Sequence, residues 1–250
     1  MLYTCTAGCA DATHRHGTRA LAATVGSRKA TAARPVVKNR KGSSKVIDLH
    51  CHYLNPAVNA KTAHLNASQY DPTVIFANEL TRQTNVKQMA SRASKLTGVT
   101  ERLRDMDRMG IDIQAVCPAP YHFFYFTEAT YGAELAREVN EGIAQLVADT
   151  PERFVGLGSV PLQNSELAVQ ELDHAVKHLG LRGVEICTSV NGKNLTDPSL
   201  KLDKFFARCE ELGVLIFMHP LGYTQADRLT SITSTTSSAT HWIPPWRCRT

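Results

Sequence analysis

The chain has 250 residues, of which 43% are hydrophobic and 20% are charged, so it can bury a core and is too apolar for a disordered protein. Its formal net charge is +5, but residues 1–45 hold nine Lys or Arg and one acid, Asp11, which leaves 19 basic and 22 acidic residues in the remainder. The basic excess therefore belongs to the N-terminal stretch. A nucleic-acid-binding function is disfavoured for the rest of the chain.

Cysteine usage and hydropathy indicate a protein without a disulfide framework or membrane spans. The seven cysteines are odd in number and lack paired C-x-x-C spacing, as expected for reduced thiols in the cytoplasm. No run approaches the roughly 18 apolar residues of a membrane span. Residues 1–45 are interpreted as a disordered leader or a misassigned start, and the alternative is an organelle transit peptide that would direct import.

From residue 45 onward, short apolar runs alternate with amphipathic segments. The runs, which are predicted to be strands, are 46–49, 111–117, 154–160, 183–187 and 213–218. The segments between them, which are predicted to be helices, are 101–109, 131–148, 165–179 and 200–212. Residues 55–98 are polar and poorly periodic, and we predict a long insertion after the first strand that lines a substrate pocket.

This β-α alternation predicts an α/β fold with a parallel sheet, either a TIM (β/α)₈ barrel or a doubly wound open sheet. A phosphate-binding loop would favour the open sheet. Neither G-x-G-x-x-G nor G-x-x-x-x-G-K-[ST] follows a predicted strand, and Gly156 and Gly158 lie within a strand and open no helix. Nucleotide-binding folds are therefore disfavoured.

Three histidines stand at the C-terminal ends of predicted strands. His50 and His52 end the first strand two residues apart, so their rings project to the same side, and His219 ends the fifth strand. These ends share the active-site face of a barrel, where neutral imidazoles suit Zn²⁺ or a similar divalent ion. The alternative is a chance H-x-H pair in contact with solvent or backbone. Asp48 follows the same alternation and is predicted to be a further ligand or an acceptor that orients an imidazole.

Other candidates carry weaker signals. His122 and Tyr121 lie in an aromatic loop directly after the second strand, where substrate contact and plain loop packing are equally compatible with the sequence. His174 and His178 are spaced i, i+4 on a predicted outer helix, where such residues usually face solvent. Cys51 points away from the histidine pair and is predicted to be a core residue, not a nucleophile.

Five segments resemble the amidohydrolase-related (amidohydrolase 2) family, including its aminocarboxymuconate-semialdehyde and γ-resorcylate decarboxylases. They are V-I-D-L-H-C-H at 46–52, R-F-V-G-L-G-S-V-P at 153–161, E-L-A-V-Q-E-L at 166–172, L-G-L-R-G-V-E-I at 179–186 and L-G-V-L-I-F-M-H-P at 212–220. The resemblance implies a (β/α)₈ barrel that holds one divalent ion, usually Zn²⁺ and in some members Mn²⁺. It maps the strand-1 ligand pair onto His50 and His52 and the strand-5 ligand onto His219.

The resemblance also implies a reaction class and partners. It points to non-oxidative decarboxylation of an unsaturated or aromatic carboxylate, a small-molecule substrate, without an organic cofactor and with dimers among relatives. The first alternative is hydrolysis of an ester, lactone or amide by the same metal centre. The second is a non-catalytic remnant.

The resemblance covers residues 45–229 and ends there. We predict a change of reading frame near Thr230, so that 46–229 form a partial barrel of about five of eight βα units and 230–250 a tail unlike the family. The strand-8 aspartate ligand and the strand-6 acid/base histidine that the family implies have no counterpart, which leaves the catalytic residues unknown. Open sheet edges then predict a poorly stable chain with weak or no activity.

Overall fold

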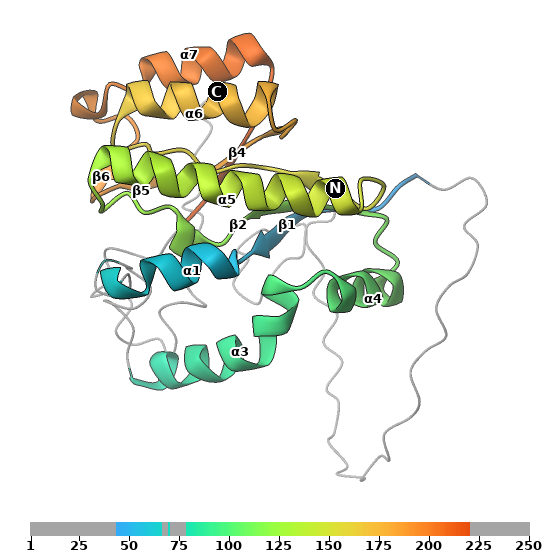
Figure 1. The fold of residues 1–250 in the computed structure, drawn as a ribbon. Helices are drawn as coiled ribbons and strands as arrows, with labels where there is room; N and C mark the ends of the chain where they lie inside the picture. Colours follow the sequence, from blue (N-terminus) through green and yellow to red (C-terminus); the bar gives the residue numbers. More distant parts are fainter. Residues whose placement is uncertain (1–43, 67–69, 71–78, 221–250) are drawn as a thin grey trace, which may run out of the picture. The chain divides into compact units, whose positions relative to one another are not determined.

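The computed structural model describes residues 44–66, 70 and 79–220 (Figure 1). The chain divides into two units, Met1–Pro35 and Val36–Thr250, and all described residues belong to the second. The predictions for residues 1–43 and for the tail at 230–250 therefore lie outside the described residues. No helix in the described part is long and apolar enough to cross a membrane.

The first parallel sheet has the strand order β1-β2-β3. Its strands are β1 (Ile47–Tyr53), β2 (Ile113–Pro118) and β3 (Phe154–Gly156). The central strand β2 is buried from Gln114 onward, as expected for a strand covered on both faces, whereas most of β1 is exposed or half-buried. The strand predicted at 154–160 is shorter than expected, because only Phe154, Val155 and Gly156 pair with β2.

A second parallel sheet pairs β4 (Gly183–Cys187) with β7 (Leu215–His219), and Cys187 stands opposite His219. A single parallel bridge from Gly158 to Val184 links the two sheets. The C-terminal ends of β1 and β7, which carry the histidines, therefore come from different sheets. Between β4 and β7 lies an unpredicted two-residue hairpin, β5 (Ser189–Val190) with β6 (Lys193–Asn194), which turns at Asn191 and Gly192 with positive φ.

Helices connect the strands, as the alternation predicts. They are α4 (Thr100–Met109), α5 (Ala129–Asp149), α6 (Ser165–Lys177) and α7 (Asp203–Leu212), with short 3₁₀ turns η3 (Pro120–His122) and η4 (Pro198–Leu200). The Glu128 and Asn164 side chains accept the first free backbone N–H groups of α5 and α6. Helices α5, α6 and α7 lie side by side (Figure 1).

The apolar faces of these helices form the core with the strands. One cluster joins β4 to α6 and α7, through Val184, Ile186, Leu172 and Phe205. Full burial of a Leu or Phe side chain stabilises a fold by about 1.5–3 kcal/mol, so this cluster fixes β4 and with it the neighbouring β7. The core thus holds β4 and β7, and with them the strand end that carries His219, in position.

The segment 55–98 differs from the prediction, because it contains two helices and a 3₁₀ turn. These are α1 (Pro56–Thr62), η1 (Ala63–Leu65) and α3 (Glu79–Thr97). The Asn55 side chain accepts the N–H groups of Ala57 and Val58, and Pro56 opens α1. This Asn-Pro start signal was missed. Helix α3 is mostly exposed and polar, so it lacks the apolar periodicity from which a helix is predicted.

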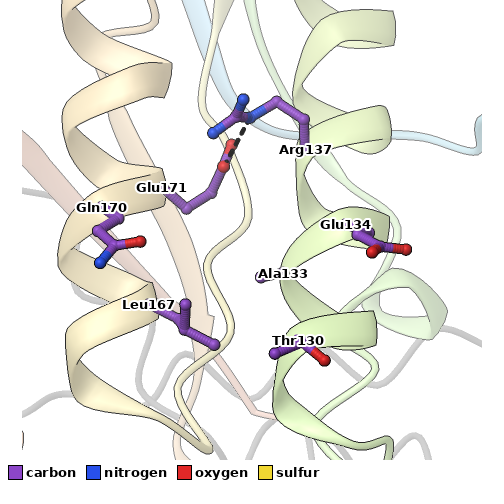
Figure 2. Close-up of a pocket in the computed structure, with 7 residues that line it drawn as sticks. All are labelled: Thr130, Ala133, Glu134, Arg137, Leu167, Gln170 and Glu171. Carbon is purple, nitrogen blue, oxygen red and sulfur yellow. Dashed lines mark hydrogen bonds and ion pairs between the residues drawn. The ribbon is translucent and has the colours of Figure 1, made fainter.

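An ion pair between a buried carboxylate and a half-exposed arginine joins α5 to α6 across a cleft of about 240 Å³ (Figure 2). Arg137 Nε donates to Glu171 Oε2 over 2.7 Å, and the amide of Asn140 donates to Glu171 Oε1 over 2.8 Å. Burial raises the pKa of Glu171 above its ordinary value, while the bonds from Asn140 and Arg137 oppose this shift. The cleft is lined by Thr130, Ala133, Glu134, Arg137, Leu167, Gln170 and Glu171.

Replacing Arg137 by methionine is expected to lower the free energy of unfolding by about 1 kcal/mol at pH 7, a modest loss because the arginine is half-exposed. The raised pKa means that Glu171 favours the folded state at acidic pH and loses this contribution as pH rises through its folded pKa. The deficit of the variant should therefore shrink as pH falls. Urea titrations between pH 4 and 8 measure it, and a deficit that is the same at every pH would contradict the assignment to Glu171.

Candidate metal centre

Three imidazoles converge where β1 and β7 end. Ring nitrogens of His50, His52 and His219 all lie within 4.8 Å of one another, and the Nε2 atoms of His50 and His52 are 3.0 Å apart. The ring centroids form a nearly equilateral triangle with sides of 4.9, 5.0 and 4.9 Å. Nitrogens bound to one tetrahedral Zn²⁺ at about 2.1 Å lie about 3.4 Å apart, so small ring movements suffice for a shared ion. The donor set fits a divalent ion.

The environment of two of these imidazoles, His52 and His219, favours the neutral form that metal ligation requires. Burial, with the nearby His219, lowers the pKa of His52 to about 4. Burial, with the nearby His50, likewise lowers the pKa of His219 to about 4. The second ring nitrogen of His52, Nδ1, lies 2.9 Å from the Pro118 carbonyl oxygen and must donate to it. Its Nε2 therefore carries a lone pair directed at the other two rings.

Asp48 does not lie where the alternation predicts. The pairing of β1 with β2 shifts between Asp48 and Cys51, and this bulge puts an extra residue into β1. Asp48 stands opposite Gln114 and accepts a 2.9 Å bond from its amide, and it also accepts a 3.1 Å bond from the backbone N–H of His50. The expectation of shared alternation with the histidines is wrong here, because a bulge reverses the side of the strand. Among described residues its carboxylate contacts no imidazole.

A buried carboxylate beside the site was not singled out in the sequence. Glu185 of β4 is fully buried, its Oε2 lies 3.8 Å from His52 Nδ1, and neither carboxylate oxygen has a hydrogen-bond partner among the described residues. Burial raises the pKa of Glu185 to about 9, so the group is protonated at neutral pH. The signal was present, because a charged residue interrupts the otherwise apolar run G-V-E-I-C.

The other candidate residues lie elsewhere. His122 is buried, its Nε2 lies 3.1 Å from the Asn59 side-chain oxygen of α1, and its ring stacks on Phe124, whereas Tyr121 is exposed. Contact with substrate stays a prediction for both residues. His174 of the outer helix α6 and His178 directly after it are neighbours, apart from the three imidazoles.

Cys51 is buried, and burial raises the pKa of its thiol to about 11. A thiol that stays protonated at neutral pH agrees with the predicted core role and not with a nucleophile.

Comparison with known proteins identifies the family. The sequence pattern of the Amidohydrolase family matches residues 47–241. The chain belongs to this family. It is 38% identical over 143 residues to a 2-amino-3-carboxymuconate-6-semialdehyde decarboxylase of Dictyostelium discoideum, which covers 57% of this chain and 37% of the relative. It is also 30% identical over 133 residues to a γ-resorcylate decarboxylase of Polaromonas sp., and this match covers 51% of this chain and 40% of the relative.

Solved structures of decarboxylases are similar as well. The 5-carboxyvanillate decarboxylase LigW from Sphingomonas paucimobilis is 27% identical with a TM-score of 0.62, over 79% of this chain and 62% of that one. A dihydroxybenzoic acid decarboxylase from Polaromonas sp., solved with bound manganese, is 23% identical with a TM-score of 0.57, over 76% and 53%. These neighbours are TIM barrels, so the described part has an α/β fold of the type found in such barrels, while the count of about five of eight βα units stays a prediction. The chain spans about two fifths of the length of its curated relatives.

Proposed function

We propose that this amidohydrolase-family chain serves metal-dependent, non-oxidative decarboxylation of an unsaturated or aromatic carboxylate. The observation that carries the proposal is the convergence of three imidazoles at the ends of β1 and β7. Relatives named as decarboxylases, which match this chain in sequence, support the reaction class. We place β1, β2, β3, β4 and β7 as the first five strands of a (β/α)₈ barrel, whose C-terminal face holds the chemistry.

In this proposal His50, His52 and His219 hold one divalent ion, Zn²⁺ or Mn²⁺. When bound, the ion supplies a Lewis acid that neutralises negative charge on the substrate. Decarboxylation breaks the bond between the carboxylate and its neighbouring carbon, releases CO₂, and leaves an electron pair on that carbon, which takes up a proton. The partly buried Phe217, whose ring centroid is 5.5 Å from that of His50, gives the site an apolar aromatic wall.

A panel of substrates tests the proposal on the full chain loaded with Zn²⁺ or Mn²⁺. We expect CO₂ release from an aromatic or unsaturated carboxylate such as 2,6-dihydroxybenzoate, and loss of release in His50→Ala. Hydrolysis of an ester, lactone or amide by the loaded chain, without CO₂ release from any carboxylate, would support the alternative activity instead. A chain that binds no stoichiometric metal would reject both and favour a non-catalytic role.

A further inference from the structure

We propose that Arg102 is a positioning residue that holds the His50-Cys51-His52 tip of β1 in the geometry that binds metal. This inference deepens the proposed function and rests on it. Arg102 lies in the first turns of α4, outside the imidazole cluster, and the ligand pattern in the sequence does not point to it.

The guanidinium of Arg102 is buried without a carboxylate partner in the part of the chain that the structure describes. Only 6% of the residue is exposed, and no Asp or Glu of the described residues comes within ion-pair distance. Burying an unpaired cation is costly unless its N–H groups find acceptors. The groups that accept hydrogen bonds from Arg102 are therefore held in position by its buried charge.

The first of these acceptors belongs to the metal-binding strand itself. Arg102 donates through Nη2 to the backbone carbonyl of His52 over 2.7 Å and to that of Lys95 over 2.8 Å, while Nη1 contacts the Cys51 thiol. Bonds from a charged donor are stronger than those between neutral groups. Arg102 thus ties the backbone of β1 at His52 to the C-terminal end of α3.

A second path leads from Arg102 to His50. Nη1 approaches the side-chain oxygen of Gln114 at 3.5 Å, the amide of Gln114 donates to Asp48, and Asp48 accepts the backbone N–H of His50. Gln114 thereby connects the guanidinium of Arg102 to the carboxylate of Asp48. Both histidines of the H-x-H pair are held by one network, His52 directly and His50 through two intermediaries.

The bulge in β1 explains why the strand needs this support. Regular pairing with β2 is interrupted between Asp48 and Cys51, so the ladder does not fix the backbone at His50. Metal ligands must be held within about 0.5 Å of their productive positions, and loss of an outer-shell partner typically weakens metal affinity by about 10–100-fold. The Arg102 network supplies the restraint that the interrupted ladder lacks.

The test compares Arg102→Met with a matched control, Arg153→Met. Arg153 also donates to two backbone carbonyls, those of Ile111 and Asp112, but at the opposite end of β2. Co²⁺ affinity of the full chain is measured by the absorption of the bound ion, and thermal unfolding is followed in parallel. We expect Arg102→Met to bind Co²⁺ about 10–100-fold more weakly, Arg153→Met to bind it like the parent, and both to unfold at lower temperature.

A conservative variant separates positioning from simple loss of folding. Arg102→Lys keeps a cation that can donate to a carbonyl but lacks the fork that also reaches Gln114, so its Co²⁺ affinity should lie between those of the parent and Arg102→Met. If Arg102→Met does not fold, Gln114→Met cuts only the path to His50 and should still weaken Co²⁺ binding. Equal Co²⁺ affinities in the parent and in every folded Arg102 or Gln114 variant would overturn the proposal.

A readout without metal keeps this inference distinct from the proposed function. In chain labelled with ¹⁵N-histidine, the ring signals of His50 and His52 should be sharp and single in the parent and in Arg153→Met, but broadened or doubled in Arg102→Met. A parent chain that binds no Co²⁺ would contradict the proposed metal-dependent function. The ring signals of His50 and His52 would still test the positioning role of Arg102. Unchanged ring signals in Arg102→Met would overturn the positioning role by themselves.

Discussion

Replacing His52 by alanine is expected to abolish stoichiometric metal binding by the full chain. The imidazole has its Nε2 lone pair directed at His50 and His219, while its Nδ1 is held by the Pro118 carbonyl. Removing it deletes one of three converging donors. The loss of affinity should exceed the about 10–100-fold that follows removal of an outer-shell partner. Metal content after dialysis, with a Co²⁺ titration, measures the effect.

His178→Ala is the matched control, because His178 is an exposed histidine directly after the outer helix α6. This variant should retain the metal content of the parent. Because His52 is neutral and only partly buried, metal-free His52→Ala should unfold near the temperature of the parent. A loss of metal binding can then be assigned to the missing imidazole and not to unfolding. Retention of one tightly bound ion per chain in His52→Ala would disprove the three-histidine site.

Replacing Gly183 by alanine is expected to destabilise the chain by about 3 kcal/mol, the upper part of the range for overpacked sites. Gly183 begins β4 opposite Leu215 of β7, and an added Cβ would lie 2.0 Å from the Leu215 carbonyl oxygen. That oxygen belongs to the backbone, so it cannot rotate away as a side chain would. The two strands must separate, and since His219 ends β7, metal affinity should fall together with stability.

Gly180→Ala provides the comparison, because an added Cβ there meets no atom within 4 Å and only the positive φ of 69° is unfavourable. It should cost about 1 kcal/mol and leave Co²⁺ affinity unchanged. Urea unfolding and Co²⁺ titration of both variants test the pair. Equal losses of stability in both variants would show that β4 and β7 are not in close contact at Gly183.

The strand ends could be predicted from the sequence because each signal there is local. A buried parallel strand is a short apolar run, and its end is marked by the polar residue that follows, as in His50, His52 and His219. Topology then brings the ends together without any knowledge of distances, since parallel strands end on one face. The alternation of strands and helices was predictable for the same reason.

Asp48, Arg102 and Glu185 could not be placed correctly because their roles depend on pairing between distant segments. The bulge that turns Asp48 away from the histidines exists only in the register of β1 against β2. A cation in an amphipathic helix, like Arg102, usually faces solvent, and burial shows only when the helix is packed. Glu185 was visible as an anomaly in an apolar run, but nothing in the sequence shows what it faces.

The location of the three imidazoles on two separate sheets would make a bound ion a cross-link between those sheets. More than half of the chain lies between His52 and His219, so a bound ion closes a long loop, as a disulfide would. Each metal-bound molecule thereby gains resistance to unfolding that depends on the free metal concentration, about 2.7 kcal/mol when that concentration is a hundred times the dissociation constant. Under the proposed metal binding, metal supply would then also govern how long the chain survives proteolysis.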